Sequence, residues 1–219
     1  MSIYFWKVLA VTLCELLAAV SGLVYWNKIR DSYWKWFPVF LLVIFMTEAI
    51  AIYFSFGLKR NDLNVYLYSY FGIPAQFLFY CWLIAQYLKP YKERKWPLFG
   101  AAIYVASWLV DILYLSDYKF VFSSFSYTVG NIVLLVLIIL FFVRFINSEE
   151  ILKYKLSMMF WVCLGLLVFF LGTFPFYALR NTLYYDFRKV FYTYLDVNFV
   201  LVYMMYILFC IAFIWAKPR

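Results

Sequence analysis

The sequence predicts an all-α fold: a bundle of seven transmembrane helices that forms one domain over residues 1–219. Composition is the first reason, because 68% of the 219 residues are hydrophobic, 26% are aromatic and only 14% are charged. Soluble globular domains do not keep that balance. The second reason is segmentation, since charged or proline-bearing clusters divide the chain into apolar runs of about 20 residues, the length that crosses a bilayer.

Each helix is expected between two such clusters. The clusters are NKIRDSYWK, GLKRNDL, KPYKERKW, a short DYKF segment, INSEEILKYK and RNTLYYDFRK. The first run has no basic leader and no A-x-A-like cleavage site, so it is expected to stay as a helix rather than be removed as a signal peptide. Only AKPR follows Trp215, so no appended kinase, nucleotide-binding or DNA-binding module is expected. The predicted helices cover residues 4–25, 36–56, 64–88, 97–116, 122–145, 156–179 and 190–215.

The distribution of lysine and arginine predicts the orientation. The first, third and fifth loops and the C-terminal tail carry twelve of these residues, and the other side carries seven. Basic residues concentrate in cytoplasmic loops, which places the N-terminus outside and the C-terminus in the cytoplasm. The net charge of +8 then reflects topology and attraction to anionic lipid headgroups, and no nucleic-acid partner is expected.

Several chemistries are excluded by missing residues. The chain has no histidine, so it can hold no histidine-bound catalytic metal and no Ser/His/Asp triad. The cysteines fall within predicted helices at no metal-like spacing, so neither a metal site, a cofactor nor a disulfide frame is expected. These are Cys14, Cys81, Cys163 and Cys210.

Two seven-helix or intramembrane families are also disfavoured. Microbial rhodopsins tie retinal to a lysine in the seventh helix, but this helix contains Asp196 and no lysine before Lys217. Intramembrane aspartyl proteases need two aspartates, which typically lie in YD and GxGD motifs. Here Tyr185-Asp186 falls in a loop, and no GxGD occurs.

Four carboxylates fall inside predicted helices. An ionised carboxylate in hydrocarbon costs about 2.5–3.5 kcal/mol or more, and no lysine or arginine is expected deep in a helix to pair with it. Such a group must be protonated, hydrogen-bonded to neutral groups or neutralised by something that binds. The four are Glu15, Glu48, Asp111 and Asp196.

Helical spacing predicts that the first two of these carboxylates face the bundle interior. Glu15 shares a face with Ala18, Ala19 and Gly22, small residues that allow close approach of another helix. Glu48 shares a face with Ala51 and Ser55. The two helices are antiparallel, and the carboxylates lie about 16 and 12 Å from the outer surface at 1.5 Å per residue. They are therefore expected to share one proton or one cation.

Polar residues in the later helices also lie mostly in the outer half, which predicts a polar cavity that opens outward. Asp111 and Asp196 are shallow, so a structural role for them stays open. Pro74 and Pro175 predict kinks, which often line cavities. Tyrosine and tryptophan at helix ends are typical of the interfacial belt, here Tyr66, Tyr68, Trp96 and Tyr184. The candidate ligand-binding residues are Glu15, Glu48, Gln76, Asp111, Asn131 and Asp196.

Two stretches resemble a family of short bacterial seven-helix membrane proteins whose function is not established. They are CELLAAVSGLVYWNKIRDSYWKWFPVFLLVIFMTEAIAIY, with glutamates in the first two helices, and MMFWVCLGLLVFFLGTFP in the sixth. The chain is also similar, more weakly, to the seven-helix sensor regions joined to bacterial histidine kinases. The resemblance implies a seven-helix fold in a bacterial inner membrane and little chemistry.

The sequence leaves several functions open. A receptor-like sensor would bind a small cation, amine or proton and signal through a separate membrane partner, with lipids as its other contacts. A proton- or cation-coupled carrier is the alternative, although Pro74 and Pro175 do not fall in equivalent places of a repeat. A lipid-acting enzyme is not expected, because no nucleophile or metal set completes an acid–base pair. An assembly subunit with purely structural carboxylates is the remaining hypothesis.

Overall fold

The computed structural model describes residues 3–115 and 124–218. Within these ranges it contains seven helices that are long and apolar enough to cross a membrane, as expected of a multi-pass membrane protein. They match the seven predicted ranges to within five residues at the described ends. The predicted ends at residues 116 and 122 lie outside the described residues. The spans are Tyr4–Val24, Tyr33–Gly57, Asn61–Leu88, Lys92–Tyr114, Phe125–Ile146, Met158–Ala178 and Arg188–Trp215.

Several spans are built from more than one helical element. The α-helices are α1 (Ile3–Val24), α2 (Trp26–Ile29), α3 (Trp36–Ile52), α4 (Asn61–Leu67), α5 (Ile73–Leu88), α6 (Trp96–Val110), α7 (Ser124–Ile146), α8 (Met158–Ala178), α9 (Arg180–Asp186) and α10 (Arg188–Trp215). The 3-10 turns are η1 (Tyr33–Lys35), η4 (Lys92–Lys95) and η6 (Glu149–Leu156). The π-helical turns are η2 (Tyr53–Gly57), η3 (Tyr68–Gly72) and η5 (Asp111–Leu115).

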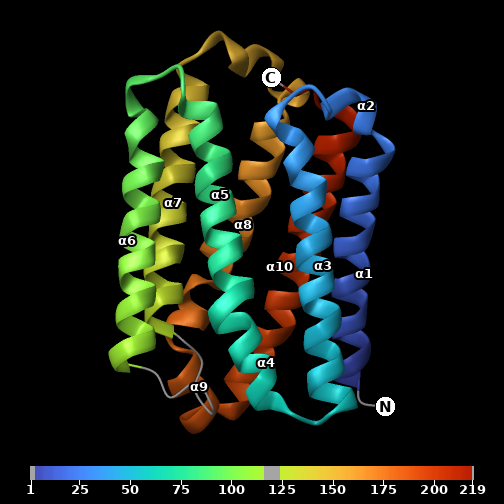
Figure 1. Cartoon of the computed structure of the whole chain (residues 1–219), viewed down its shortest axis with the longest axis vertical. Coiled ribbons are helices and arrows are strands. Elements are labelled where there is room, and N and C mark those ends of the chain that lie inside the picture. The colour runs from blue at the N-terminus through green and yellow to red at the C-terminus, as the bar shows by residue number, and fades with distance from the viewer. Residues whose placement is uncertain (1–2, 116–123, 219) are drawn as a thin grey trace.

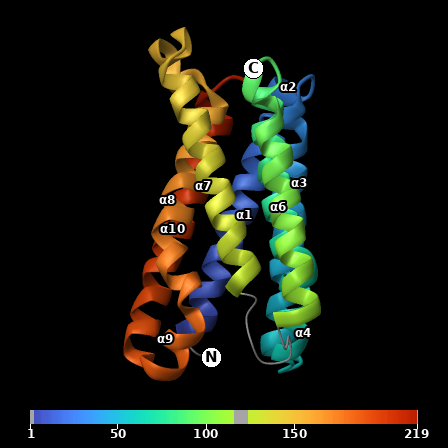
Figure 2. The same ribbon diagram turned by 90° about the vertical axis from the view of Figure 1, so that its left-hand side faces the viewer.

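The long helices run side by side along one axis (Figure 1). One end of the bundle, here named the N-terminal end, holds the N-terminus, α4 and α9, and the opposite C-terminal end holds α2, η4, η6 and the C-terminus. Helix α10 packs most extensively on α8, and α1 packs between α3 and α10. Helix α5 packs on α6 and α7, and α7 packs on α8. Figure 2 shows α3 and α6 on one side of the bundle and α7, α8 and α10 on the other.

The interior near the C-terminal end is filled by aromatic rings. Phe37 of α3 contacts Phe209 and Phe213 of α10, with ring centroids 5.1 and 5.4 Å apart, and all three side chains are fully buried. Phe40 stacks on Phe79 of α5 at 3.8 Å between centroids. Large buried rings contribute strongly to packing energy, so these contacts stabilise this half of the bundle.

The small-residue face predicted on α1 lies against α3. Ala18 and Ala19 are fully buried. A Cβ atom added at Gly22 would lie 2.4 Å from Cγ of Pro38 in α3. The absence of a side chain at Gly22 is therefore what allows α1 and α3 to approach this closely.

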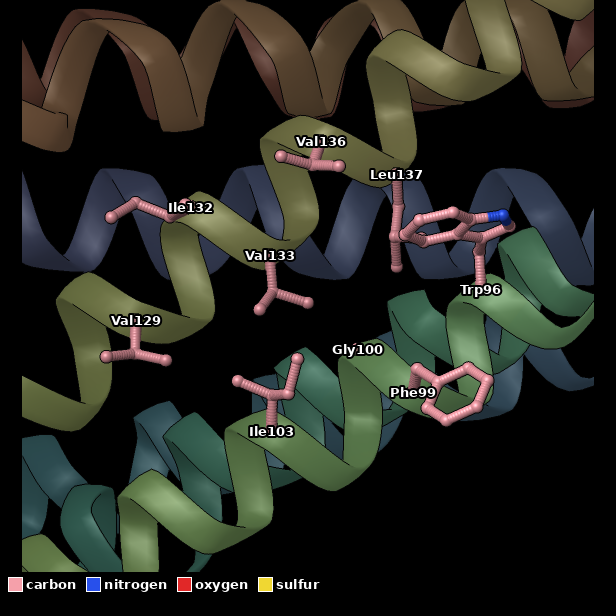
Figure 3. A pocket seen from close by; sticks show the side chains of 9 residues that line it. All are labelled: Trp96, Phe99, Gly100, Ile103, Val129, Ile132, Val133, Val136 and Leu137. Carbon is pink, nitrogen blue, oxygen red and sulfur yellow. The ribbon is translucent and has the colours of Figure 1, made fainter. Parts of the chain in front are cut away.

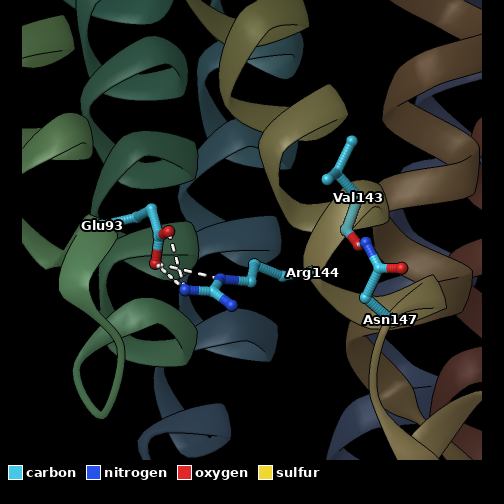
Figure 4. Close-up of polar contacts among 4 residues, drawn as sticks. All are labelled: Glu93, Val143, Arg144 and Asn147. Carbon is cyan, nitrogen blue, oxygen red and sulfur yellow. Dashed lines mark hydrogen bonds and ion pairs between the residues drawn. The ribbon is translucent and has the colours of Figure 1, made fainter.

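Polar contacts hold the loops at the C-terminal end. Arg144 of α7 donates from Nη2 to both carboxylate oxygens of Glu93 in η4 at 2.7 Å (Figure 4). Its guanidinium also lies 5.3 Å from the centroid of the Tyr91 ring. Lys28 of α2 donates to the carbonyl of Phe213 at 3.0 Å, near the C-terminus of α10, where cations are favourable. Burial, and then the nearby charge of Lys217, lower the pKa of this amine.

The π-helical turns lie near the N-terminal end of the bundle: η3 interrupts the third span, and η2 and η5 form the last turns of the second and fourth spans. Turn η3 directly precedes Pro74, whose ring clashes with a regular helix, and the wider turn accommodates it. Its carbonyl at Ser69 accepts a hydrogen bond from the indole of Trp108 at 2.9 Å. Pro175 lies inside α8, three residues before that helix ends. The two prolines thus mark irregular backbone beside the same end of the bundle.

Candidate functional site

The N-terminal half of the bundle encloses a cavity of about 720 Å³. It lies between residues of α1, α3, α5, α7, α8 and α10, with α4, α9 and two π-helical turns near the N-terminal end. Tyrosine, amide and hydroxyl side chains line it together with aliphatic and phenylalanine side chains. Its volume is in the range of pockets that hold small molecules. Charged residues of the described lining are Glu15, Glu48 and Arg180.

Glu15 lies at the deep end of this cavity. Its position on the small-residue side of α1 turns it toward α10, and only 3% of its surface is exposed. The hydroxyl of Tyr206 donates to Oε1 of this carboxylate at 2.9 Å. The other oxygen, Oε2, is buried and has no hydrogen-bond partner among the residues that the structure describes. Such an atom normally has a partner, because leaving it without one costs about 1–3 kcal/mol.

Glu48 reaches the same cavity from α3. Tyr68 of η3 donates its hydroxyl to Oε2 of Glu48 at 2.5 Å. The carboxylates of Glu48 and Glu15 interact electrostatically, and Glu15 also interacts electrostatically with the side chain of Tyr80. The structure thus brings together the two glutamates that the sequence paired, with phenol groups as their protein donors.

Amide side chains extend the polar lining toward the N-terminal end. Gln76 of α5 lines the cavity, as predicted from the sequence for a ligand-binding residue. Asn64 of α4 donates to the hydroxyl of Ser55 at 2.9 Å, which ties α4 to turn η2. Asn198 of α10 completes this polar group. These side chains offer both donors and acceptors to a bound molecule.

Arg180 is the cationic residue of the described lining. It is the first residue of the short helix α9, and its guanidinium lies 5.7 Å from the centroid of the Tyr177 ring. From its sequence this arginine is expected in a loop, and no basic residue is expected to pair with the glutamates. The short α9 brings it to the wall of the cavity instead.

Two candidate residues lie outside the cavity lining and make structural contacts. Asp111 is 1% exposed, and its Oδ2 accepts a hydrogen bond from the backbone N–H of Ser126 at 3.0 Å. Ser126 belongs to the first turn of α7, where backbone N–H groups lack partners within the helix, so Asp111 caps that helix. Asn131 is fully buried and donates to the carbonyl of Phe170, which links α7 to α8.

Asp196 also lies outside the cavity, on the face of α10 that meets α1. It forms an ion pair with Lys7 at 2.6 Å, with 62% of its side chain exposed. Tyr203, two turns further along α10, donates to the backbone carbonyl of Lys7 at 3.3 Å. The cavity is instead lined by a neighbouring face of α10 that carries Leu195 and Asn198. Asp196 is thus neutralised by Lys7, a basic residue near the start of α1 rather than deep in a helix, and not by a proton, neutral groups or a bound ligand as the sequence predicts.

A second hollow of about 320 Å³ lies between α6 and α7 and has a different character (Figure 3). Its lining is apolar, with Trp96, Ile103 and Val136 about half exposed. Gly100 faces Val133, and a Cβ atom added there would lie 2.7 Å from Cγ1 of that valine. Apolar side chains at the surface of a membrane-spanning helix face lipid tails, so this hollow adds no chemistry.

Sequence reasoning missed several residues of the cavity. Tyr68 is predicted as a belt residue, yet it donates to Glu48. Its position four residues, about one helical turn, after Asn64 is the pattern that favours an inward direction. Tyr206 lies ten residues after Asp196 and was not considered. Asn198 is an amide inside a predicted span, which by itself marks a candidate. Arg180 gave no such indication, because its loop contains several charges.

The chemistry of the cavity is inferred from its geometry, because similarity to known proteins does not supply it. The resemblances to short bacterial seven-helix proteins and to sensor regions of histidine kinases stay predictions. No family model, no curated protein and no solved structure matches the chain.

Proposed function

We propose that this chain is a receptor-like protein of a bacterial inner membrane that binds a small cationic molecule in its N-terminal cavity and signals through a separate membrane partner. The single observation that carries the proposal is the buried Oε2 of Glu15, which has no partner among the described residues and lies beside a second carboxylate, Glu48. Two neighbouring carboxylates in an apolar surrounding repel each other unless a proton or a cation lies between them. A bound amine supplies that charge, and a proton is the smallest ligand that does so.

The surrounding rings favour an amine over a metal ion. Tyr80 and Tyr206 lie near Glu15, and Phe169 and Phe170 line the same deep end. The faces of aromatic rings attract ammonium groups, and this attraction strengthens where water is excluded. A metal ion would instead need several oxygen ligands close together. Among the described residues no cluster of three or more acidic or cysteine side chains could hold one.

The proposed orientation gives the ligand an aqueous entrance. The lysine and arginine distribution favours an outward N-terminal end, which is the end toward which the polar lining extends. Tyr4, Asn61 and Tyr184 line the cavity there and are exposed. The ligand therefore enters from outside the cell and reaches the glutamates by passing between tyrosines.

The packing below the cavity supports a receptor rather than an open pore. Beyond the glutamates, toward the C-terminal end, the next interior side chains are buried almost completely: Ala19, Leu41, Ile84, Leu166 and Phe209. A binding cavity with a closed floor can change helix packing when it is filled, and a partner protein can read that change. A receptor of this kind requires no path for the ligand through the membrane.

Ligand binding in detergent or nanodiscs tests the proposal. A panel of primary and quaternary amines should raise the unfolding temperature of the wild-type protein, because a ligand at 100 times its Kd stabilises by about 2.7 kcal/mol. Glu48→Gln should abolish the shift, and the matched control Glu149→Gln, an exposed glutamate at the other end, should keep it. An identical shift in wild type and Glu48→Gln, or no shift with any amine and no dependence on pH, would contradict the proposal.

A small proton- or cation-coupled carrier is the second candidate. The observation that favours it is the π-helical turn η3, which interrupts the third span beside the cavity, together with the π-helical turn η2 at the end of the second span. Interrupted helices line the binding sites of many carriers and allow segments to move. Uptake of a labelled amine into proteoliposomes, driven by a pH gradient and lost in Glu48→Gln, would establish a carrier. Binding without uptake would leave the receptor.

A further inference from the structure

Arg180 and the two glutamates line one cavity but enter it from different parts of the chain. Glu15 and Glu48 come from the middle of the long helices α1 and α3, whereas Arg180 begins α9 near the N-terminal end. Tyr4 and Tyr177 each interact electrostatically with both Glu48 and Arg180. The opposite charges are therefore close enough to act on the same side chains, and the cavity has an acidic deep end and a basic outer end.

We propose that the ligand is a zwitterion, with an ammonium group that binds at Glu15 and Glu48 and a carboxylate or phosphate group that binds at Arg180. This inference rests on the proposed function and specifies the ligand class. The guanidinium presents a planar set of donors that matches a carboxylate or a phosphate in pairs. The guanidinium lies over the Tyr177 ring, 5.7 Å from its centroid, a cation–π contact that favours this position.

Charge balance favours a zwitterion over a simple amine. If the two glutamates hold one proton between them, their charge and that of Arg180 add to zero. A zwitterion leaves that sum unchanged, whereas a simple amine adds one positive charge to a cavity that is largely shielded from water. An unbalanced charge in such surroundings is costly. The polar amides between the two ends, Gln76 and Asn198, suit the middle of such a molecule.

The cavity also sets the size of the ligand. About 720 Å³ is enough for a molecule the size of an amino acid or a short peptide, or for the headgroup of a phospholipid. An ammonium and an acidic group on one chain occur in amino acids and in phosphoethanolamine. A soluble molecule and a lipid headgroup of this kind carry the same ammonium and acidic groups, and nanodiscs with and without phosphatidylethanolamine distinguish between them.

A matched series of probes tests the inference. ω-Amino carboxylates of increasing length, from glycine to 8-aminooctanoate, are compared with n-alkylamines of the same length by calorimetry on the wild-type chain in phosphatidylglycerol nanodiscs. The best ω-amino carboxylate should bind at least about tenfold more tightly than its matched alkylamine, the effect of one charge-assisted contact. The length at which affinity is greatest then measures the separation of the two ends.

Variants of two arginines assign the effect. Arg180→Gln should remove the preference for the zwitterion and leave alkylamine affinity equal to or greater than that of wild type, because the variant removes a positive charge from the cavity; retained amine binding also shows that the variant is folded. Arg180→Lys should restore part of the preference. The control Arg188→Gln changes an exposed arginine that lies 5.8 Å from the Tyr184 ring but does not line the cavity, and it should behave as wild type.

The outcomes separate the two proposals. Equal affinity for the zwitterion and its matched amine, in wild type and Arg180→Gln alike, overturns the zwitterion and leaves the amine receptor standing. Binding of neither probe class overturns both. Phosphoethanolamine in solution, tested against nanodiscs with and without phosphatidylethanolamine, identifies the source. Loss of ω-amino carboxylate binding only in the lipid-containing discs shows that a lipid headgroup occupies the site, and equal binding in both shows a soluble ligand.

Discussion

The N-terminal and C-terminal halves of the bundle are formed by the same seven long helices, but their interiors differ. Near the C-terminal end, Phe37, Phe209 and Phe213 contact one another, and the loops are held by Arg144 and Glu93. Near the N-terminal end the helices surround a cavity that is lined by Glu15, Glu48 and Arg180, and Oε2 of Glu15 has no hydrogen-bond partner among the described residues. Dense apolar packing stabilises one half, while the other half carries polar groups that destabilise it. This division is typical of proteins that keep binding residues at a cost in stability.

The same substitution at two positions of α10 that lie ten residues apart gives the largest expected contrast. Phe209→Ala should lower the free energy of unfolding by about 3–5 kcal/mol, because the fully buried ring leaves a cavity in the packed half. Phe199→Ala, which removes a half-buried ring at the wall of the existing cavity, should cost about 1 kcal/mol or less. Unfolding of both variants in mixed detergent micelles measures the difference. Equal losses would show that the two halves are packed alike.

Two glycines give the next contrast. Gly22→Ala places a methyl group 2.4 Å from the rigid ring of Pro38, so α1 and α3 must separate, and a loss of about 1–3 kcal/mol is expected. Gly172→Ala places it 2.6 Å from Cδ1 of Leu201, the far end of a side chain that can change rotamer. The second variant should therefore cost clearly less in the same unfolding measurement. A larger loss for Gly172→Ala would mean that α8 and α10 have no freedom to adjust.

The stability effect of Glu15 should have the opposite sign. Glu15→Gln keeps an acceptor for the Tyr206 hydroxyl and removes a buried carboxylate whose second oxygen lacks a described partner. The free energy of unfolding without ligand should rise by about 1 kcal/mol, while amine affinity falls at least about tenfold. Glu149→Gln, on the exposed surface of the C-terminal end, should change neither quantity. A destabilised Glu15→Gln variant would show that this carboxylate is structural.

The helices themselves follow from sequence because apolar length and charged interruptions depend on local residues alone. The direction of Glu15 followed from the small residues on its face, since those residues must contact a neighbour. The direction of Glu48 was predictable in the same way, from Ala51 and Ser55 on its face. The short loop between the first two long helices indicated that the two glutamates are neighbours. Local pattern was sufficient wherever one helix and its sequence neighbour determined the contact.

The remaining site residues depend on contacts between distant segments. Asp111 lies next to the start of α7, and its role as a cap depends on where that helix begins relative to it. Asp196 and Asn198 lie two residues apart on α10 and meet different neighbours, which helical spacing alone cannot decide. Arg180 reaches the cavity because α9, which follows α8 at the N-terminal end of the bundle, places it at the wall. Tertiary packing, not residue type, separates these residues from one another.

The smallest expected effect on stability and affinity concerns the ion pair of Lys7 and Asp196. Substituting these residues tests whether every carboxylate at the N-terminal end belongs to the binding site. Both side chains are substantially exposed, at 39% and 62%, so solvent weakens their attraction. Asp196→Asn should leave the unfolding temperature and the affinity for amines unchanged, and Lys7→Gln should do the same. If Asp196→Asn instead weakens amine binding as much as Glu48→Gln does, the carboxylate acts at a distance on the ligand's charge. The effect would then fade as salt is raised, because salt screens exposed charges but not the buried contacts of Glu15 and Glu48.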